Sequence, residues 1–240
     1  MGTDQPDIAE IVAETMVAVE TIARALHVKE ARLEPTLDAI ITNAAATHPA
    51  ADDAGVILLV RGKLVPQATT GRPPQILDLW QQETGEGPCV EAASKQTVIC
   101  ISDTGDDARW PGFCAEAQAC GVRAMLCAPL WVDEECMGTL TLFSQQAAAF
   151  GAPDIKLIEL FAALAALSLA EAQRTGNLRE AMVNRDLIGQ AKGILMERYK
   201  IDGETAFGML ARASQDLNLK LAAIARHLTE TGEMLGPTPA

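Results

Sequence analysis

The stretch NRDLIGQAKGILMER, residues 184–198, is the most informative segment of this chain about its fold. Its apolar residues recur at helical spacing, and small residues stand at 189, 191 and 193. Arg185, Lys192 and Tyr199 recur every seven residues, which places them near one face of a helix. The pattern predicts a small helical module that contacts an anionic partner. The alternative is a solvated cationic face beside ordinary helix–helix packing.

Helical patterns extend to both sides of this stretch. Downstream of residue 173 we expect helices over 177–199, 203–216 and 220–231, and a disordered tail at 236–240. Upstream, a long helix begins near Asp154 and has few helix-breaking residues until Gly176. Its apolar residues either cover a sheet of the same chain or pair with a second copy as a coiled coil, and one helix can do both.

Residues 1–173 mix strands with helices. Adjacent strand pairs interleaved with helices predict an α+β fold, in which helices pack on an antiparallel sheet. We expect helices at 8–26, 33–46, 76–82, 90–94 and 111–119, strand pairs at 56–60 with 64–68 and 122–132 with 136–143, and a single strand at 97–101.

Charge divides the chain into two parts. Of a net charge of −13, residues 174–235 carry nine Lys and Arg against eight Asp and Glu, a net of +1. The acidity therefore belongs to residues 1–173, and it excludes non-specific nucleic-acid binding by the whole surface. This asymmetry predicts two domains, 1–173 and 174–235.

Several classes of protein are disfavoured by the composition. The first ten residues are polar and acidic, unlike a signal peptide, and the apolar run at 157–170 contains Glu159 and is too short to span a bilayer. We therefore expect a cytoplasmic protein with no membrane partner and with six free, mostly buried cysteines. No cysteine–histidine spacing indicates zinc, and His27 and His48 lie outside any expected haem pocket. No metal or cofactor is predicted.

Residues 7–173 resemble a GAF domain, a small-molecule sensor fold. The resemblance rests on element order and on GEGPCVEA at 85–92, WPGF at 110–113 and MGTL at 137–140. It implies a ligand pocket between the sheet and the short helices, although the residue types favour ordinary core over ligand contact for each candidate. The candidates are Trp80, Trp110, Phe113, Met125, Cys127, Trp131 and Phe143.

Residues 174–235 resemble an ANTAR domain, the RNA-binding output of bacterial antiterminators. The matching residues are AKGILM at 191–196, Ala206, Leu210, Arg212, ASQ at 213–215, Asn218, Lys220, Leu221 and Ala225. Together the two segments look like the GAF–ANTAR architecture of actinobacterial regulators. That family implies homodimers that recognise paired RNA stem-loops near terminators and promote transcription antitermination.

RNA binding requires cations for phosphates and polar side chains that read unpaired bases. A module of net charge +1 can make only ~3–5 phosphate contacts, so two modules acting together, in a dimer formed through the helix from Asp154, would supply the remaining affinity. Ile194, Leu195, Met196, Leu210 and Leu221 are expected in the core. The expected RNA contacts are Arg185, Lys192, Arg198, Arg212, Ser214, Gln215, Asn218 and Lys220.

Cysteine chemistry leaves alternatives to a non-enzymatic regulator. Cys89 follows a glycine-rich turn and is expected near a helix N-terminus, which lowers a thiol pKa. The same turn resembles that of the GAF-fold free methionine sulfoxide reductases, and Cys114 and Cys120 approximate the region of their other catalytic cysteines. A thiol redox enzyme, a redox sensor and a protein-interaction module therefore remain open.

Overall fold

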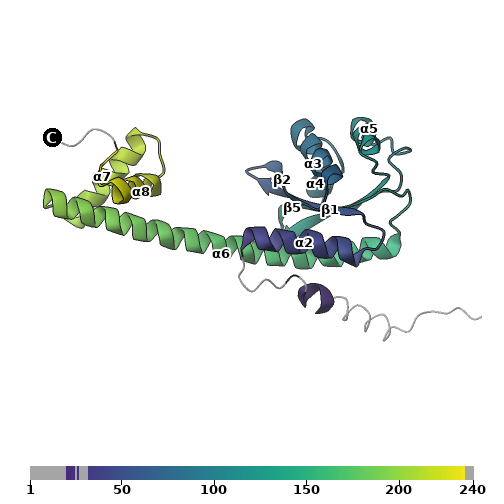
Figure 1. Ribbon diagram of the computed structural model, residues 1–240, viewed down its shortest axis with the longest axis horizontal. Helices are drawn as coiled ribbons and strands as arrows, with labels where there is room; N and C mark the ends of the chain where they lie inside the picture. The colour runs from purple at the N-terminus through teal and green to yellow at the C-terminus, as the bar shows by residue number, and fades with distance from the viewer. Residues whose placement is uncertain (1–19, 25, 27–31, 236–240) are drawn as a thin grey trace, which may run out of the picture. The chain divides into compact units, whose positions relative to one another are not determined.

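The computed structural model describes residues 20–24, 26 and 32–235 (Figure 1). Most of the helix predicted at 8–26 and the tail predicted at 236–240 lie outside the described residues. The chain divides into two compact units, residues 1–173 and 174–240, which are described separately. The predicted α+β class is confirmed, with an antiparallel sheet in the first unit and helices alone in the second.

The first unit is built on a five-stranded antiparallel sheet in the order β2-β1-β5-β4-β3 (Figure 1). Both predicted strand pairs are present, and β5 lies between β1 and β4. The strands are β1 Asp53–Val60, β2 Lys63–Thr69, β3 Ile99–Ile101, β4 Ala124–Val132 and β5 Glu135–Ser144.

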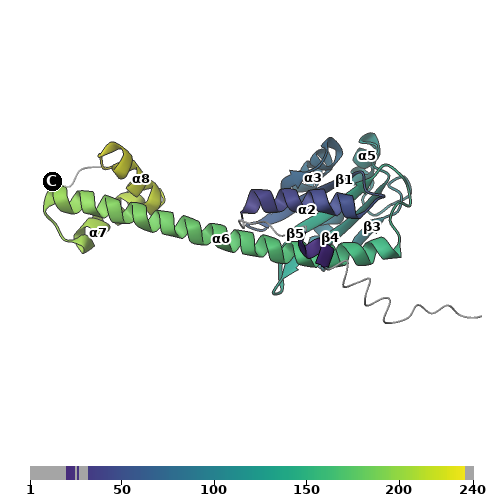
Figure 2. The ribbon, with the colours of Figure 1, turned by 60° about the horizontal axis from the view of Figure 1, so that its bottom comes forward.

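Helices cover both faces of the sheet (Figures 1 and 2). Helix α2 (Leu33–Thr47) and the first part of α6 (Ala152–Tyr199) pack against one face, and α3 (Arg72–Thr84), α4 (Pro88–Lys95) and α5 (Pro111–Ala119) pack against the other. Successive strand residues point to opposite faces. In β4, Leu126 and Ala128 therefore join the α2 and α6 core, while Met125 and Cys127 join the α3, α4 and α5 side.

Two helices run further than the sequence pattern indicates. We expected Pro73 and Pro74 to precede a helix at 76–82, but α3 already begins at Arg72. Proline is tolerated in a first turn because its missing N–H has no intrahelical partner there. The expected break near Gly176 is also wrong, since α6 passes through Gly176 without interruption and is 48 residues long in total. A single glycine costs a helix only about 1 kcal/mol.

The second unit is a three-helix arrangement of the end of α6, α7 (Gly203–Asp216) and α8 (Leu221–Thr231). Its core contains Ala191 and Leu195 of α6, Leu210 of α7 and Ile224 of α8. Asp202 caps α7, because its carboxylate accepts a hydrogen bond from the Thr205 N–H at 2.8 Å. The same interaction lowers the pKa of Asp202.

Gly138 fixes the closest approach of two strands. It pairs with Leu58 of β1 and has a φ of +150°, a conformation that side-chain-bearing residues rarely adopt. A β-carbon at this position would collide with the backbone carbonyl of Ile57. The contact is with backbone, so no side-chain rotation can relieve it.

We expect Gly138→Ala to lower the free energy of unfolding by about 3 kcal/mol or more, because the strand pairing must open to admit the methyl group. Thermal unfolding followed by circular dichroism measures the loss. Gly176→Ala is the matched control, since nothing lies within 4 Å of its added β-carbon. A variant at 138 as stable as the variant at 176 would contradict this account.

Candidate nucleic-acid interface and sensor interior

Lys192 lies at the junction of α6 with α7. Its side chain is half-buried, and its Nζ would lie 3.5 Å from a β-carbon built on Gly203, the first residue of α7. Met196 extends towards the same glycine. The Lys192 ammonium is therefore held beside the start of α7 and does not project freely from α6.

Arg198 forms part of the fold. Its Nη2 donates a 2.6 Å hydrogen bond to the carbonyl of Gly232, the residue that caps the C-terminus of α8. A cation at this end complements the helix dipole. Tyr199 packs partly against the core, whereas Arg185 is exposed. The three residues that recur every seven positions, Arg185, Lys192 and Tyr199, thus lie in three different environments.

The turn between α7 and α8 gathers four of the expected RNA contacts. The Ser214 hydroxyl donates a 2.6 Å hydrogen bond to the Leu219 carbonyl, so it holds the turn closed. Asn218 has a φ of +51° at the tip of the turn. Gln215, Asn218 and Lys220 are exposed. The structure thus brings together three outward polar side chains, with Ser214 as their internal support.

Helix α7 also presents an aromatic side chain that the sequence analysis missed. Phe207 is 43% exposed, and at 100° per residue Phe207, Gln215 and Arg212 fall within about 140° of one another around α7. A helical wheel could have found it, because the buried residues Ala206, Leu210 and Ala213 lie to one side of it. Exposed aromatics are the usual platforms for stacking nucleic-acid bases.

The segment 184–198 differs from expectation at Met196 and at two of its small residues. Met196 is 39% exposed, so placing it in the core was wrong. It follows the buried Leu195 by one residue, which turns it about 100° away from the core. Gly189 and Gly193 would meet no atom within 4 Å if they carried a β-carbon. The small residues at these two positions therefore do not serve packing within the described chain.

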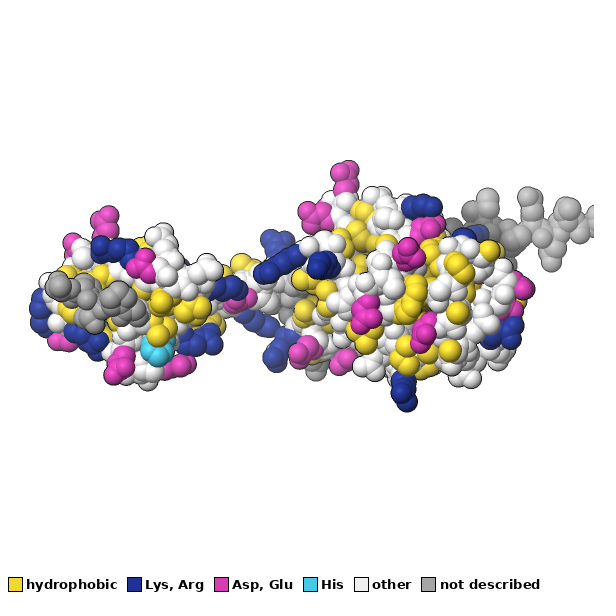
Figure 3. All heavy atoms as spheres, turned by 90° about the horizontal axis from the view of Figure 1, so that it is seen from above, with side chains coloured by type: hydrophobic (Ala, Val, Ile, Leu, Met, Phe, Trp, Pro, Cys, Tyr) yellow, Lys and Arg dark blue, Asp and Glu magenta, His cyan; other side chains and the backbone are white. Residues whose placement is uncertain are grey.

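The surface of the second unit is mixed in charge. On the face shown in Figure 3, Lys and Arg side chains are interspersed with Asp, Glu and apolar ones. This distribution agrees with the net charge of +1 between residues 174 and 235. Charge alone therefore does not single out one anion-binding face.

The aromatic residues expected around a sensor pocket occupy two places. Phe113 and Met125 are fully buried in the core beneath α3 and α5, where Trp80 meets Phe113 edge-on with ring centroids 5.8 Å apart. The Arg109 guanidinium lies over the Trp110 ring at 4.5 Å. Trp131 lies elsewhere, at a cavity between β4 and α6.

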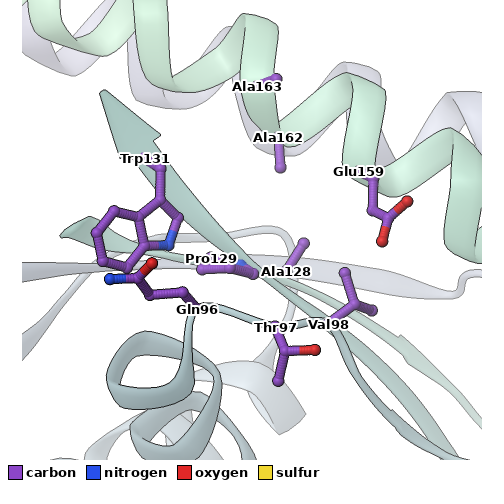
Figure 4. A pocket seen from close by; sticks show the side chains of 9 residues that line it. All are labelled: Gln96, Thr97, Val98, Ala128, Pro129, Trp131, Glu159, Ala162 and Ala163. Carbon is purple, nitrogen blue, oxygen red and sulfur yellow. The ribbon is translucent and has the colours of Figure 1, made fainter. Parts of the chain in front are cut away.

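That cavity has a volume of about 270 Å³ and lies between α6 and the end of β4 (Figure 4). The Trp131 ring forms one wall, and its buried indole Nε1 has no hydrogen-bond partner. Glu159 and the Gln96 amide supply polar groups at the wall. The remaining lining residues are Thr97, Val98, Ala128, Pro129, Ala162 and Ala163.

Cys89 lies in a polar cluster within the sheet–helix interface. It is fully buried in the first turn of α4, and its N–H donates to the Gln81 Oε1 at 2.8 Å. The Cys127 thiol hydrogen-bonds the Cys89 sulfur and, with Thr141 and Gln81, lowers the pKa of Cys89 to about 7 despite burial. Gly87 permits this arrangement, because a β-carbon there would lie 2.5 Å from Gln81 Oε1.

Cys114 and Cys120 belong to a different part of the interior. Both lie at α5 with the core around Phe113, and burial raises the pKa of each thiol. The contact partner of Cys89 is Cys127, which the sequence analysis had named only as a pocket candidate.

Asp78 adds a buried carboxyl group on α3. It is fully buried, and neither of its carboxylate oxygens has a hydrogen-bond partner. Burial raises its pKa well above the usual value, and the nearby Cys89 raises it further. Burial thus favours the neutral form of this group, and a buried polar group without hydrogen-bond partners reduces stability.

Comparison with known protein families assigns both units. A model of the GAF domain matches residues 30–169, more than half of the chain. The chain belongs to the GAF family. A model of the ANTAR domain matches residues 176–228, so this GAF protein carries a signal-sensing domain followed by an RNA-binding antitermination module. That domain content is characteristic of a regulator rather than an enzyme.

Solved structures share the fold of the first unit. The GAF domain of a phosphoenolpyruvate-protein phosphotransferase from Coxiella burnetii has a TM-score of 0.54 and 18% identity, over 69% of this chain and 98% of that chain. The corresponding Acinetobacter domain has a TM-score of 0.53 and 16% identity, over 68% and 98%. A free methionine-R-sulfoxide reductase from Neisseria meningitidis, in complex with its substrate, has a TM-score of 0.50 and 18% identity, over 72% and 97%. A search of curated proteins finds no match.

Among the described residues, no helix combines the length and the apolar character needed to cross a membrane. Within the same residues, no group of three or more His, Cys, Asp or Glu side chains is placed to hold a metal ion.

We expect Ser214→Ala to lower the stability of the helical unit by about 1 kcal/mol, because the Leu219 carbonyl loses its donor. Urea unfolding of the full chain followed by circular dichroism measures the change. The neighbouring exposed Gln215→Ala is the control and should stay within ~0.5 kcal/mol of the parent. Equal stability of the two variants would remove the supporting role of Ser214.

We expect Asp78→Asn to raise the thermal unfolding midpoint at pH 7 and to lose this advantage towards pH 4. The pKa of Asp78 is raised in the folded chain, so the unfolded chain ionises first and stability falls as pH rises from the unfolded pKa through the folded pKa. Asparagine has no proton to retain. Melting both proteins at several pH values tests this, and a difference independent of pH would contradict it.

Proposed function

We propose that this protein is a cytoplasmic, homodimeric GAF–ANTAR regulator of the actinobacterial type. Its helical unit binds paired RNA stem-loops and thereby promotes transcription antitermination in response to a signal at the GAF domain. The observation that carries the proposal is the exposed group of Gln215, Asn218 and Lys220 at the α7–α8 turn, within the residues that match the ANTAR domain.

The exposed side chains suit RNA better than a uniformly basic surface would. Lys192, Arg212 and Lys220 can neutralise phosphates, while Gln215 and Asn218 can hydrogen-bond the edges of unpaired bases. Phe207 offers an exposed ring about 80° around α7 from Gln215, where a splayed base can stack. Few cations and several base-reading groups favour loops over continuous duplex.

The middle of α6 supports a dimer. Leu178 is 60% exposed and Met182 is 68% exposed, and both share a helix face with the exposed Leu167. Residues 176–183 are all exposed, so no hydrophobic core within the described part of the chain stabilises this helix segment. Pairing with the same segment of a second copy buries these side chains as a coiled coil.

Dimerisation would also compensate for the small number of cations that each helical unit offers to RNA phosphates. A module with ~3–5 phosphate contacts binds weakly near physiological salt, whereas linking two modules raises avidity by roughly 10²-fold or more when both sites are engaged. The GAF signal can act only by favouring one of two states of the dimer, since a ligand shifts an equilibrium through its differential affinity.

We expect Lys192→Ala to raise the Kd for a tandem stem-loop RNA about tenfold, because a charged hydrogen bond to phosphate is lost. The slope of log Kd against log salt concentration should fall by about one contact. Electrophoretic mobility shift with the full chain measures both quantities, and RNA recovered from cells on the tagged protein supplies the target.

The matched control is Lys200→Ala, since Lys200 is already paired with Glu197 at 2.7 Å. Its Kd should remain near the parent value. Phe207→Ala should weaken binding with no change in salt slope, because stacking releases no counterion. A Lys192 variant that binds like the parent would count against that residue, and failure to recover any RNA would favour a protein partner.

A further inference from the structure

Two of the six cysteines touch one another inside the GAF unit. Cys89 is in the first turn of α4 and Cys127 is in β4, and their sulfur atoms are 3.7 Å apart. Both side chains are completely buried. The strand register places Cys127 directly opposite Thr141 of β5, so the two thiols share one polar cluster on the sheet.

The two sulfurs have different environments. Cys89 receives hydrogen bonds from the Cys127 thiol and from the Gln81 amide at 3.2 Å, and its sulfur lies 3.3 Å from the Thr141 hydroxyl, a pair in which either atom can donate. These donors stabilise its thiolate, as hydrogen bonds to a charged form do. Cys127 has the opposite balance, because burial first and the adjacent Cys89 second raise its pKa. Cys89 is thus favoured as the nucleophilic thiolate, and Cys127 is favoured in its protonated thiol form.

We propose that Cys89 and Cys127 form a redox-active dithiol that a peroxide oxidises to an intramolecular disulfide. The proposed dithiol site is separate from RNA binding, and its chemistry does not depend on the RNA-binding function. Only its use as the input that controls the helical unit rests on the proposed function.

The reaction proceeds in two balanced steps. The Cys89 thiolate attacks one oxygen of hydrogen peroxide, the O–O bond breaks, and Cys89 sulfenic acid and hydroxide form. Cys127 sulfur then attacks the Cys89 sulfur, the S–O bond breaks, and water leaves as the S–S bond forms. Hydroxide takes up the proton that Cys89 released. Two thiols and one peroxide give one disulfide and two waters.

Closing the pair requires a small local movement. A disulfide bond is about 2.0 Å long, so the sulfurs must approach by about 1.7 Å from their 3.7 Å separation. The Gln81 amide, which hydrogen-bonds Cys89 and so ties α4 to α3, must adjust to this movement. Cys89 follows the exposed Glu86 by three residues, so an opening of this short turn admits a molecule as small as peroxide.

The remaining four cysteines lack the lowered thiol pKa of Cys89. Burial raises the pKa of each thiol, in Cys100, Cys114, Cys120 and Cys136. Less thiolate means slower reaction with peroxide. The geometry therefore selects one pair among six free cysteines.

The test uses the full chain, reduced, desalted and treated with one equivalent of hydrogen peroxide near neutral pH. N-ethylmaleimide added in denaturant then blocks the remaining thiols, the buried ones included, and peptide mass spectrometry locates the linkage. We expect two of the six thiols to become unreactive and a cross-linked peptide pair joining Cys89 to Cys127. The oxidation rate of the parent chain should rise with pH through about 7, as Cys89 ionises.

Three variants sharpen the result. Cys127→Ser should stop at a Cys89 sulfenic acid that dimedone traps, Cys89→Ser should leave Cys127 reduced, and Cys136→Ser should still form the disulfide. A linkage between other cysteines, or a Cys89–Cys127 pair that stays fully alkylatable in the parent chain, would overturn the proposal whether or not the variants fold.

An RNA titration of the reduced and oxidised parent chain separates this site from the proposed function. If the disulfide forms and RNA affinity changes at least several-fold, the dithiol is an input. If the disulfide forms and affinity is unchanged, the redox site stands and its role as input fails. If neither state binds RNA, the proposed function fails and the thiol chemistry is unaffected.

Discussion

Helix α6 must complete two separate hydrophobic cores, and this constraint shapes the molecule. Ile158 and Phe161 fill the core of the GAF unit, while Ala191 and Leu195 fill the core of the helical unit. Between these clusters, residues 176–183 are buried against nothing in the described chain. A bare helix of this length is marginal in water. The apolar Leu178 and Met182 are exposed on that segment, and this exposure is the basis of the proposed pairing with a second chain.

The two faces of the GAF sheet bury different kinds of side chain. The core beneath α2 and α6 is largely aliphatic apart from the cavity at Trp131 and Glu159, whereas the face beneath α3 and α4 buries Asp78, Gln81, Cys89 and Thr141. Buried polar groups reduce stability unless they are fully paired, and the Asp78 oxygens are not. A structure under selection for stability alone would fill this interface with aliphatic side chains. Stability alone therefore does not account for the polar residues of this cluster.

The sequence predicted those features that depend on local pattern. Alternating apolar residues and turns gave both strand pairs, and Pro111 marked the start of α5. Features that depend on packing were missed. The contact of Cys89 with Cys127 joins residues 38 positions apart through the seating of α4 on β4, which no spacing encodes. The ANTAR motif located the α7–α8 turn, but only coordinates distinguish Ser214, which closes the turn, from the exposed Gln215 beside it.

Within the GAF unit, the thickness of one strand separates the polar cluster from α6. Cys127 faces α4, while its neighbours Leu126 and Ala128 face the core that contains Phe161 of α6. Close-packed interiors transmit displacement because they contain little free volume. A shift of β4 that accompanies closure of the dithiol therefore bears directly on the helix whose continuation enters the RNA-binding unit. Within the described residues, positions 176–183 of that helix have no packing partner. If two chains pair through this exposed segment, as proposed above, it is the part of α6 where a change in the sensor would act on that pairing.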